Sequence, residues 1–132
     1  MKKTKRILVI DDEVTALNLL QKIFEGEGYE VHMATNGREG VELFRRQPCD
    51  LVITDMVMPV MDGLQTILEL REIASDLPVI AISGGGAISK ERYLTVAGYL
   101  DKVITIAKPF SVEAIVNAAA GLLRDQATAA DE

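Results

Sequence analysis

Five short apolar segments alternate with segments of helical periodicity, and this alternation limits the possible folds more than any other feature of the chain. The apolar segments are rich in β-branched residues, which predicts strands. They are nearly continuous in hydrophobicity, as are strands buried on both faces of a parallel sheet. The pattern therefore predicts an α/β domain with helices on both faces of the sheet. The expected strands are Arg6–Ile10, Tyr29–Ala34, Asp50–Thr54, Pro78–Ser83 and Lys102–Ala107.

The segments between the strands carry apolar residues at three- and four-residue spacing, which predicts helices. Asn36 with Glu39 three residues later resembles a capping box at the start of the second helix. Ser111 is the expected cap of the last helix. Further helices are expected over Leu64–Ile73 and, with a poorer apolar stripe, over Ser89–Gly98.

The length of 132 residues fits one domain. We expect this domain over residues 1–125, followed by a frayed tail over 126–132. No apolar run approaches the roughly 20 residues that cross a bilayer, and the basic N-terminus lacks the apolar region of a signal peptide. The expected location is therefore the cytoplasm. A net charge of −6 argues against a nucleic-acid partner, and the single Cys49 has no second thiol for a disulfide or metal site.

Polar residues occur at the ends of four predicted strands. Right-handed crossovers place the carboxyl ends of parallel strands at one edge of the sheet, where open α/β sheets bind their ligands. Each residue has an ordinary explanation on its own: Asp12, for example, could cap a helix. Their joint occurrence at separate strand ends favours one shared functional site. The residues are Asp11 and Asp12, Asp55, Ser83 and Lys108.

Three carboxylates at one edge repel one another. Two unit charges about 4 Å apart interact by roughly 4 kcal/mol at an effective dielectric constant near 20. Protonation or a bound cation relieves this repulsion. A divalent cation together with Lys108 would balance the three negative charges. Oxygen ligands favour a hard ion, so we expect Mg²⁺, or alternatively Mn²⁺, in weak and exchangeable binding.

A carboxylate beside a divalent cation, a lysine and a hydroxyl is suited to phosphoryl transfer. The transition state spreads negative charge over three oxygens, and the cation, Lys108 and Ser83 could each contact one of them. Asp55 is the expected acceptor because it stands alone at its strand end. Asp11 and Asp12 are adjacent and are better suited to holding the cation.

The motifs "ILVIDDE", "DLVITDMVMPVMDG", "PVIAISG" and "AKPF" occur in an order that closely resembles the receiver domains of two-component response regulators, here of the stand-alone, single-domain type. The resemblance runs from about Lys5 to Leu123. It implies a flavodoxin-like three-layer fold with strand order 2-1-3-4-5. It also implies that Asp55 accepts a phosphoryl group from the phosphohistidine of a histidine kinase or of a histidine phosphotransfer protein.

The resemblance also assigns individual roles. Asp12 would bind Mg²⁺ directly, Asp11 through water and Val57 through its backbone carbonyl. Ser83 would bind a phosphoryl oxygen, and Lys108 would pair with the phosphoryl charge. The aromatic residue that the family usually carries three positions before the lysine is replaced by Thr105, and the bond from that lysine to Pro109 would be cis.

The expected activity is limited to phosphorylation and dephosphorylation of the chain itself, so it is not expected to be an enzyme acting on other substrates. Its output would pass through an unidentified protein target or a phosphorelay, without nucleic acid or membrane.

Three other functions were considered. A Mg²⁺-dependent aspartyl-phosphate phosphatase would need a second acid two residues after its nucleophile, where this chain has Val57. A flavodoxin would need a phosphate-binding loop where this chain has "DDE". A degenerate receiver that acts only as a scaffold would lack site residues that are all present here.

Overall fold

The computed structural model describes residues 4–58, 60–83 and 101–131, with side chains to residue 124. All strand pairs in its sheet are parallel. The order is β2-β1-β3-β4-β5, which confirms the predicted topology. The strands are β1 (Arg6–Ile10), β2 (Glu30–Ala34), β3 (Leu51–Asp55), β4 (Val79–Ser83) and β5 (Val103–Ala107).

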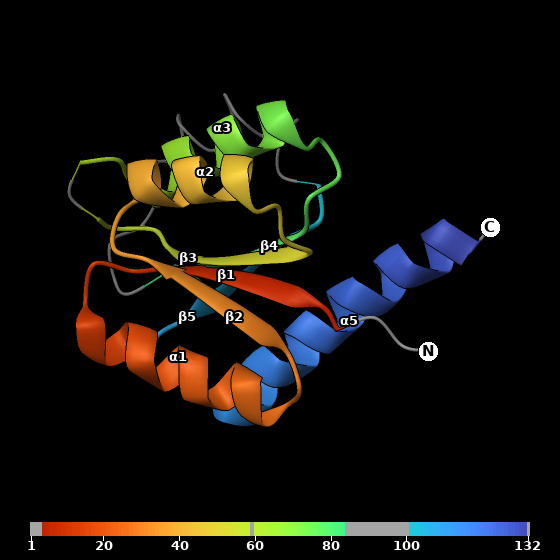
Figure 1. Cartoon of the computed structure of the whole chain (residues 1–132). Helices are drawn as coiled ribbons and strands as arrows, with labels where there is room; N and C mark the ends of the chain where they lie inside the picture. The colour runs from red at the N-terminus through yellow and green to blue at the C-terminus, as the bar shows by residue number, and fades with distance from the viewer. Residues whose placement is uncertain (1–3, 59, 84–100, 132) are drawn as a thin grey trace.

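Helices cover both faces of this sheet. Figure 1 shows α2 (Gly37–Arg46) and α3 (Gly63–Ile73) on one face, and α1 (Val14–Gly26) and α5 (Val112–Asp131) on the other. Helix α5 includes residues 126–131, which we had assigned to a tail. The helix expected over Ser89–Gly98 lies outside the described residues. No helix in the described part of the chain has both the length and the hydropathy of a membrane span.

Alternate side chains of each strand enter two separate cores. In β1, Ile7 and Val9 pack with residues of α1 and α5, whereas Leu8 and Ile10 pack with residues of α2 and α3. All four side chains are essentially inaccessible to solvent. Because successive residues of a strand point to opposite faces, a strand covered on both sides must be apolar throughout. This requirement explains the continuous apolar segments of the sequence.

The predicted caps are present, with one difference. Asn36 accepts a hydrogen bond from the backbone N–H of Glu39 at 2.8 Å, and the Ser111 hydroxyl accepts one from the N–H of Ala114 at 3.0 Å. The Glu39 carboxylate, however, turns back to the N–H and hydroxyl of Thr35. The reciprocal half of the capping box therefore engages the residue before the cap, where a second donor is available.

Val60, in the connection between β3 and α3, has a left-handed backbone conformation with φ of 71°. A β-branched side chain at positive φ is strained, by roughly 1–2 kcal/mol. Its side chain is 76% exposed and so gains little from packing.

Replacing Val60 with Gly is therefore expected to stabilise the protein by roughly 0.5–1 kcal/mol, after the greater entropy of unfolded glycine is subtracted. Urea unfolding would measure the change. Val60→Ala serves as the control, because it removes the branched side chain but keeps a Cβ at positive φ, and its gain should be smaller. Equal or greater stability of the Ala variant would contradict the explanation by backbone strain.

Candidate functional site

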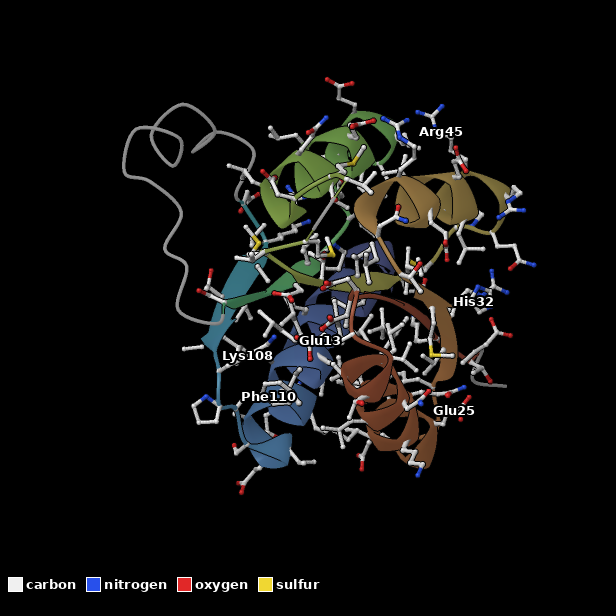
Figure 2. The ribbon with its side chains drawn as sticks, turned by 90° about the vertical axis from the view of Figure 1, so that its left-hand side faces the viewer. Glu13, Glu25, His32, Arg45, Lys108 and Phe110 are labelled. Atoms are coloured by element: carbon white, nitrogen blue, oxygen red, sulfur yellow. The ribbon has the colours of Figure 1, made fainter. Side chains whose placement is uncertain are left out.

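Strand register brings the predicted site residues to one edge of the sheet. Asp55 is the last residue of β3 and pairs with Ile82, and Ser83 ends β4 opposite Ala107. The N–H of Lys108 continues this ladder by donating to the carbonyl of Ser83 at 2.8 Å. Figure 2 looks onto this edge, with Lys108 near the middle of the view.

Strand β3 runs one residue further than the sequence predicts and ends at Asp55 instead of Thr54. The difference arises because the N–H of Met56 donates to the carbonyl of Ile82 at 3.0 Å, which extends the pairing with β4. The backbone of Asp55 is therefore held by the sheet rather than by a loop. Its side chain points to the edge and is only slightly exposed, with the residue 5% accessible.

The three acids gather as the sequence predicted. Asp11, Asp12 and Asp55 each place one carboxylate oxygen within 4.8 Å of the other two. Asp11 is 1% accessible to solvent, whereas Asp12 is exposed. Two acids of the cluster, Asp11 and Asp55, are therefore buried, and Asp12 is exposed to solvent.

The environment of Asp11 opposes its ionisation. Burial raises the pKa of the Asp11 carboxyl above its ordinary value, and repulsion by Asp55 and Asp12 raises it further. A hydrogen bond from the N–H of Glu13 to Oδ1, 2.9 Å long, and the charge of Lys108 act in the opposite direction. Burial is the largest of these effects, so the neutral form of Asp11 is favoured more than it would be in solvent.

Lys108 supplies the positive charge next to Asp55. Its Nζ lies 3.5 Å from Oδ2 of Asp55, while Oδ1 accepts a long hydrogen bond of 3.4 Å from the N–H of Val57. The Lys108–Pro109 peptide bond is cis, as the resemblance implied. Asp55 therefore has a cation on one oxygen and the acid cluster beside it.

All the site residues predicted from the sequence lie at this edge, but the glycine packed behind Asp55 was not recognised as part of the site. Gly63 begins α3, and its N–H donates to the carbonyl of Met56 at 3.1 Å. A Cβ at this position would overlap the carbonyl oxygen of Asp55. In the sequence, Gly63 directly precedes the expected helix Leu64–Ile73, but its contact with Asp55 depends on how α3 packs.

Replacing Asp11 with Asn tests the electrostatic description. Because the folded-state pKa of Asp11 is raised, the folded chain binds more protons than the unfolded chain above the ordinary carboxyl range. The contribution of Asp11 to stability therefore falls as pH rises through this window. Asn keeps an oxygen for the Glu13 N–H and removes the charge, so the metal-free variant should be more stable than wild type at neutral pH.

Urea unfolding with a chelator would measure this difference at several pH values. The advantage of the variant should shrink as pH falls through the raised folded-state pKa of Asp11, because the wild-type carboxyl becomes protonated there, and should be smallest near the ordinary carboxyl range of about 4. An advantage that grows on acidification would contradict the sign of the pKa shift.

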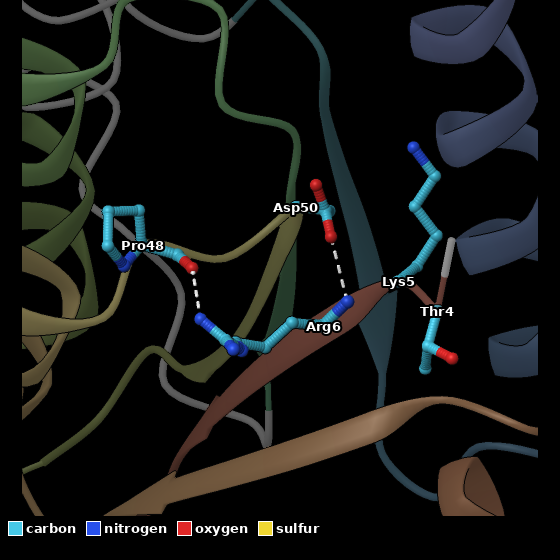
Figure 3. A pocket seen from close by; sticks show the side chains of 5 residues that line it. All are labelled: Thr4, Lys5, Arg6, Pro48 and Asp50. Carbon is cyan, nitrogen blue, oxygen red and sulfur yellow. Dashed lines mark hydrogen bonds between the residues drawn. The ribbon is translucent and has the colours of Figure 1, made fainter.

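A cavity of about 210 Å³ lies at the opposite, amino edge of the sheet, lined by Thr4, Lys5, Arg6, Pro48 and Asp50. Figure 3 shows hydrogen bonds from Arg6 to two of the other lining residues. Arg6 donates from its guanidinium to the Pro48 carbonyl at 3.0 Å and from its N–H to the Asp50 carboxylate at 2.8 Å. These bonds tie the start of β1 to the start of β3 and so have a structural role.

Comparisons with known proteins identify the family and the fold of the chain. Residues 7–120 match the family model described as response regulator receiver domain. The transcriptional regulatory protein GlrR of Escherichia coli K12 is 33% identical over 130 residues, which cover 98% of this chain but 29% of GlrR. The chain thus spans less than a third of the length of that relative.

Solved structures show the same fold. A receiver domain protein from Clostridium thermocellum superimposes with a TM-score of 0.81 at 28% identity, covering 94% of this chain and 98% of the other. A CheY-like receiver domain protein from Methanospirillum hungatei superimposes with a TM-score of 0.86 at 25% identity, covering 96% and 98% of the two chains.

Proposed function

Since the chain belongs to the response regulator receiver domain family, we propose that Asp55 accepts a phosphoryl group from a phosphohistidine of a histidine kinase or histidine phosphotransfer protein. The observation that carries this proposal is the placement of Asp55, which has Lys108 3.5 Å from one oxygen and two further carboxylates within 4.8 Å. The proposed nucleophile, a cation and a proposed set of metal ligands therefore lie together at the carboxyl edge of the sheet.

The acid cluster fits Mg²⁺, or Mn²⁺ as the alternative. Three carboxylate oxygens within 4.8 Å form a hard donor set, and a cation there would relieve the repulsion among the three negative charges. Asp11, Asp12 and Asp55, with the backbone carbonyl of Val57, are the proposed ligands. The bound ion would neutralise charge on the incoming phosphoryl oxygens.

In the proposed reaction a carboxylate oxygen of Asp55 forms a bond to phosphorus while the phosphorus–nitrogen bond of the phosphohistidine breaks. The histidine leaves with the bonding electrons and is neutral once it holds one proton. Lys108 stabilises one phosphoryl oxygen by its charge, and Ser83 donates its hydroxyl to another. Hydrolysis of the acyl phosphate later returns Asp55 to its carboxylate form.

The chain would therefore catalyse only its own phosphorylation and dephosphorylation. The signal would leave through a downstream protein target or by further transfer of the phosphoryl group. A phosphatase acting on other substrates is not favoured, because Val57 occupies the position two residues after Asp55 and offers only a hydrocarbon side chain, 60% exposed.

Incubation with acetyl phosphate and Mg²⁺, followed by measurement of the intact mass, tests the proposal. We expect a mass increase of one phosphoryl group that requires Mg²⁺ or Mn²⁺ and disappears when a chelator is added. Chemical phosphodonors replace the kinase in this experiment, so an unchanged mass at high donor and metal concentrations would refute the function.

A further inference from the structure

We propose that Gly37, the first residue of α2, is a positioning residue that holds the connection between β3 and α3, and thereby the carboxylate of Asp55, in place. This inference rests on the proposed phosphoryl transfer to Asp55. Gly37 does not reach the acid cluster itself, and its effect is carried through Met61, Thr66 and Gly63.

The first link joins α2 to the end of the connection. Gly37 is buried, and a Cβ at its position would stand 3.0 Å from the carbonyl oxygen and 3.1 Å from the Cβ of Met61. It would also collide with the hydroxyl oxygen of Thr66. The backbone of α2 therefore packs directly against α3, with no room for a side chain.

The second link joins Thr66 to the cap of α3. The Thr66 hydroxyl, fully buried, donates to the carbonyl of Asp62 at 2.8 Å. The Asp62 carboxylate in turn accepts the N–H of Gln65 at 2.8 Å. The Thr66 hydroxyl thus lies against Gly37 of α2 and also hydrogen-bonds to the residue that caps α3.

The third link reaches the acceptor. Gly63 follows Asp62 and donates its N–H to the carbonyl of Met56 at 3.1 Å. A Cβ on Gly63 would overlap the carbonyl of Asp55 and approach Cα of Met56 to 2.6 Å. The start of α3 therefore packs directly against the backbone of Asp55 and Met56, so a shift of α3 must move one of these two residues.

The carboxylate of Asp55 depends on this support because its local contacts are weak. The hydrogen bond from Val57 is 3.4 Å long, and Lys108 lies at 3.5 Å, both beyond the usual range for a strong hydrogen bond. Misplacement of a reacting group by about 1 Å can lower a rate by roughly 100-fold. A small displacement transmitted from α2 is therefore expected to affect the reaction more than it affects folding.

The test is the rate of labelling by acetyl phosphate at saturating donor and Mg²⁺, read from the intact mass. Gly37→Ala is expected to label at least 10-fold more slowly than wild type. Removing the obstructing hydroxyl should recover part of the rate, so the double variant Gly37→Ala/Thr66→Ala is expected to label several-fold faster than Gly37→Ala. It should still label more slowly than wild type, because it also loses the hydroxyl bond to Asp62. A purely structural loss of stability would not be corrected in this way, because Thr66→Ala removes a buried hydrogen bond.

Gly40→Ala is the matched control. It lies one turn further along α2, makes the same chemical change, and its Cβ would press on the end of the Ile10 side chain rather than on a backbone. It should label at the wild-type rate, even with a lowered melting temperature. If Gly37→Ala does not fold, Thr66→Val takes its place in the test. This substitution keeps the side-chain volume but loses the bond to Asp62, and it should slow labelling several-fold.

If wild type takes up the phosphoryl group and Gly37→Ala or Thr66→Val labels at the same rate, the positioning role is overturned and the proposed function remains intact. Equal slowing in Gly37→Ala and Gly40→Ala, or no recovery in the double variant, would also overturn it. Failure of wild type itself to take up a phosphoryl group would instead refute the proposed function and the inference with it.

Discussion

Replacing Asp55 with Asn is expected to reduce phosphoryl uptake from acetyl phosphate below detection. The amide has no anionic oxygen to attack phosphorus, so the acyl phosphate cannot form. The fold should remain, because the backbone of Asp55 is held by the ladder to β4 through Met56 and Ile82. Removing one of three clustered charges should also make the metal-free variant at least as stable as wild type.

Intact mass after incubation with acetyl phosphate and Mg²⁺ measures this effect. Asp50→Asn is the matched control, because Asp50 directly precedes the same strand at the opposite, amino edge and the substitution removes the same charge. Asn can still accept the hydrogen bond from the N–H of Arg6, which is 2.8 Å long. Full labelling of Asp55→Asn would show that another residue is the acceptor, and lost labelling of Asp50→Asn would point to a general effect of charge.

Replacing Gly63 with Ala is expected to cause the largest loss of stability among the substitutions considered. In a helix, this change normally stabilises by roughly 0.5–1 kcal/mol. Here the added Cβ would overlap the carbonyl of Asp55 and lie 2.6 Å from Cα and 2.8 Å from Sδ of Met56. Two of these atoms are backbone atoms of the central sheet and of the residue after it, so they cannot rotate aside.

We therefore expect a loss of about 3 kcal/mol or more, which is a large part of the 5–15 kcal/mol that holds a typical domain folded. The melting temperature should fall by roughly 10 °C. Gly26→Ala is the control, because a Cβ there meets no atom within 4 Å, and it should be neutral or slightly stabilising. Similar losses in both variants would contradict the packing argument.

Strand prediction from the sequence was accurate, because burial on both faces leaves a strong signal. Strands β2, β4 and β5 each begin one residue later than expected, β3 is shifted by one residue at both ends, and β1 agrees at both ends. The shift at β3 has a functional consequence, since pairing with Ile82 puts Asp55 inside the sheet. Hydrogen bonds to a neighbouring strand decide such ends, and these are not visible in one segment of sequence.

Two glycines show where prediction from the sequence stopped. In the sequence, Gly63 only precedes an expected helix, and Gly37 only follows the expected cap Asn36. Their importance comes from atoms of Asp55, Met61 and Thr66, which are brought to them by packing of α2 against α3. Because glycine has no side chain, the sequence offers no chemical group from which such a contact could be predicted.

The sequence by itself determined the layered parallel fold and the residues that meet at the carboxyl edge, because hydrophobic periodicity is a local property that locates each strand to within about one residue. Only the tertiary structure decided the 3.5 Å approach of Lys108 to Asp55, the burial that raises the pKa of Asp11 and the seating of α3 on the acceptor backbone. These depend on distances between segments far apart in the chain, which are set by how the helices and strands pack.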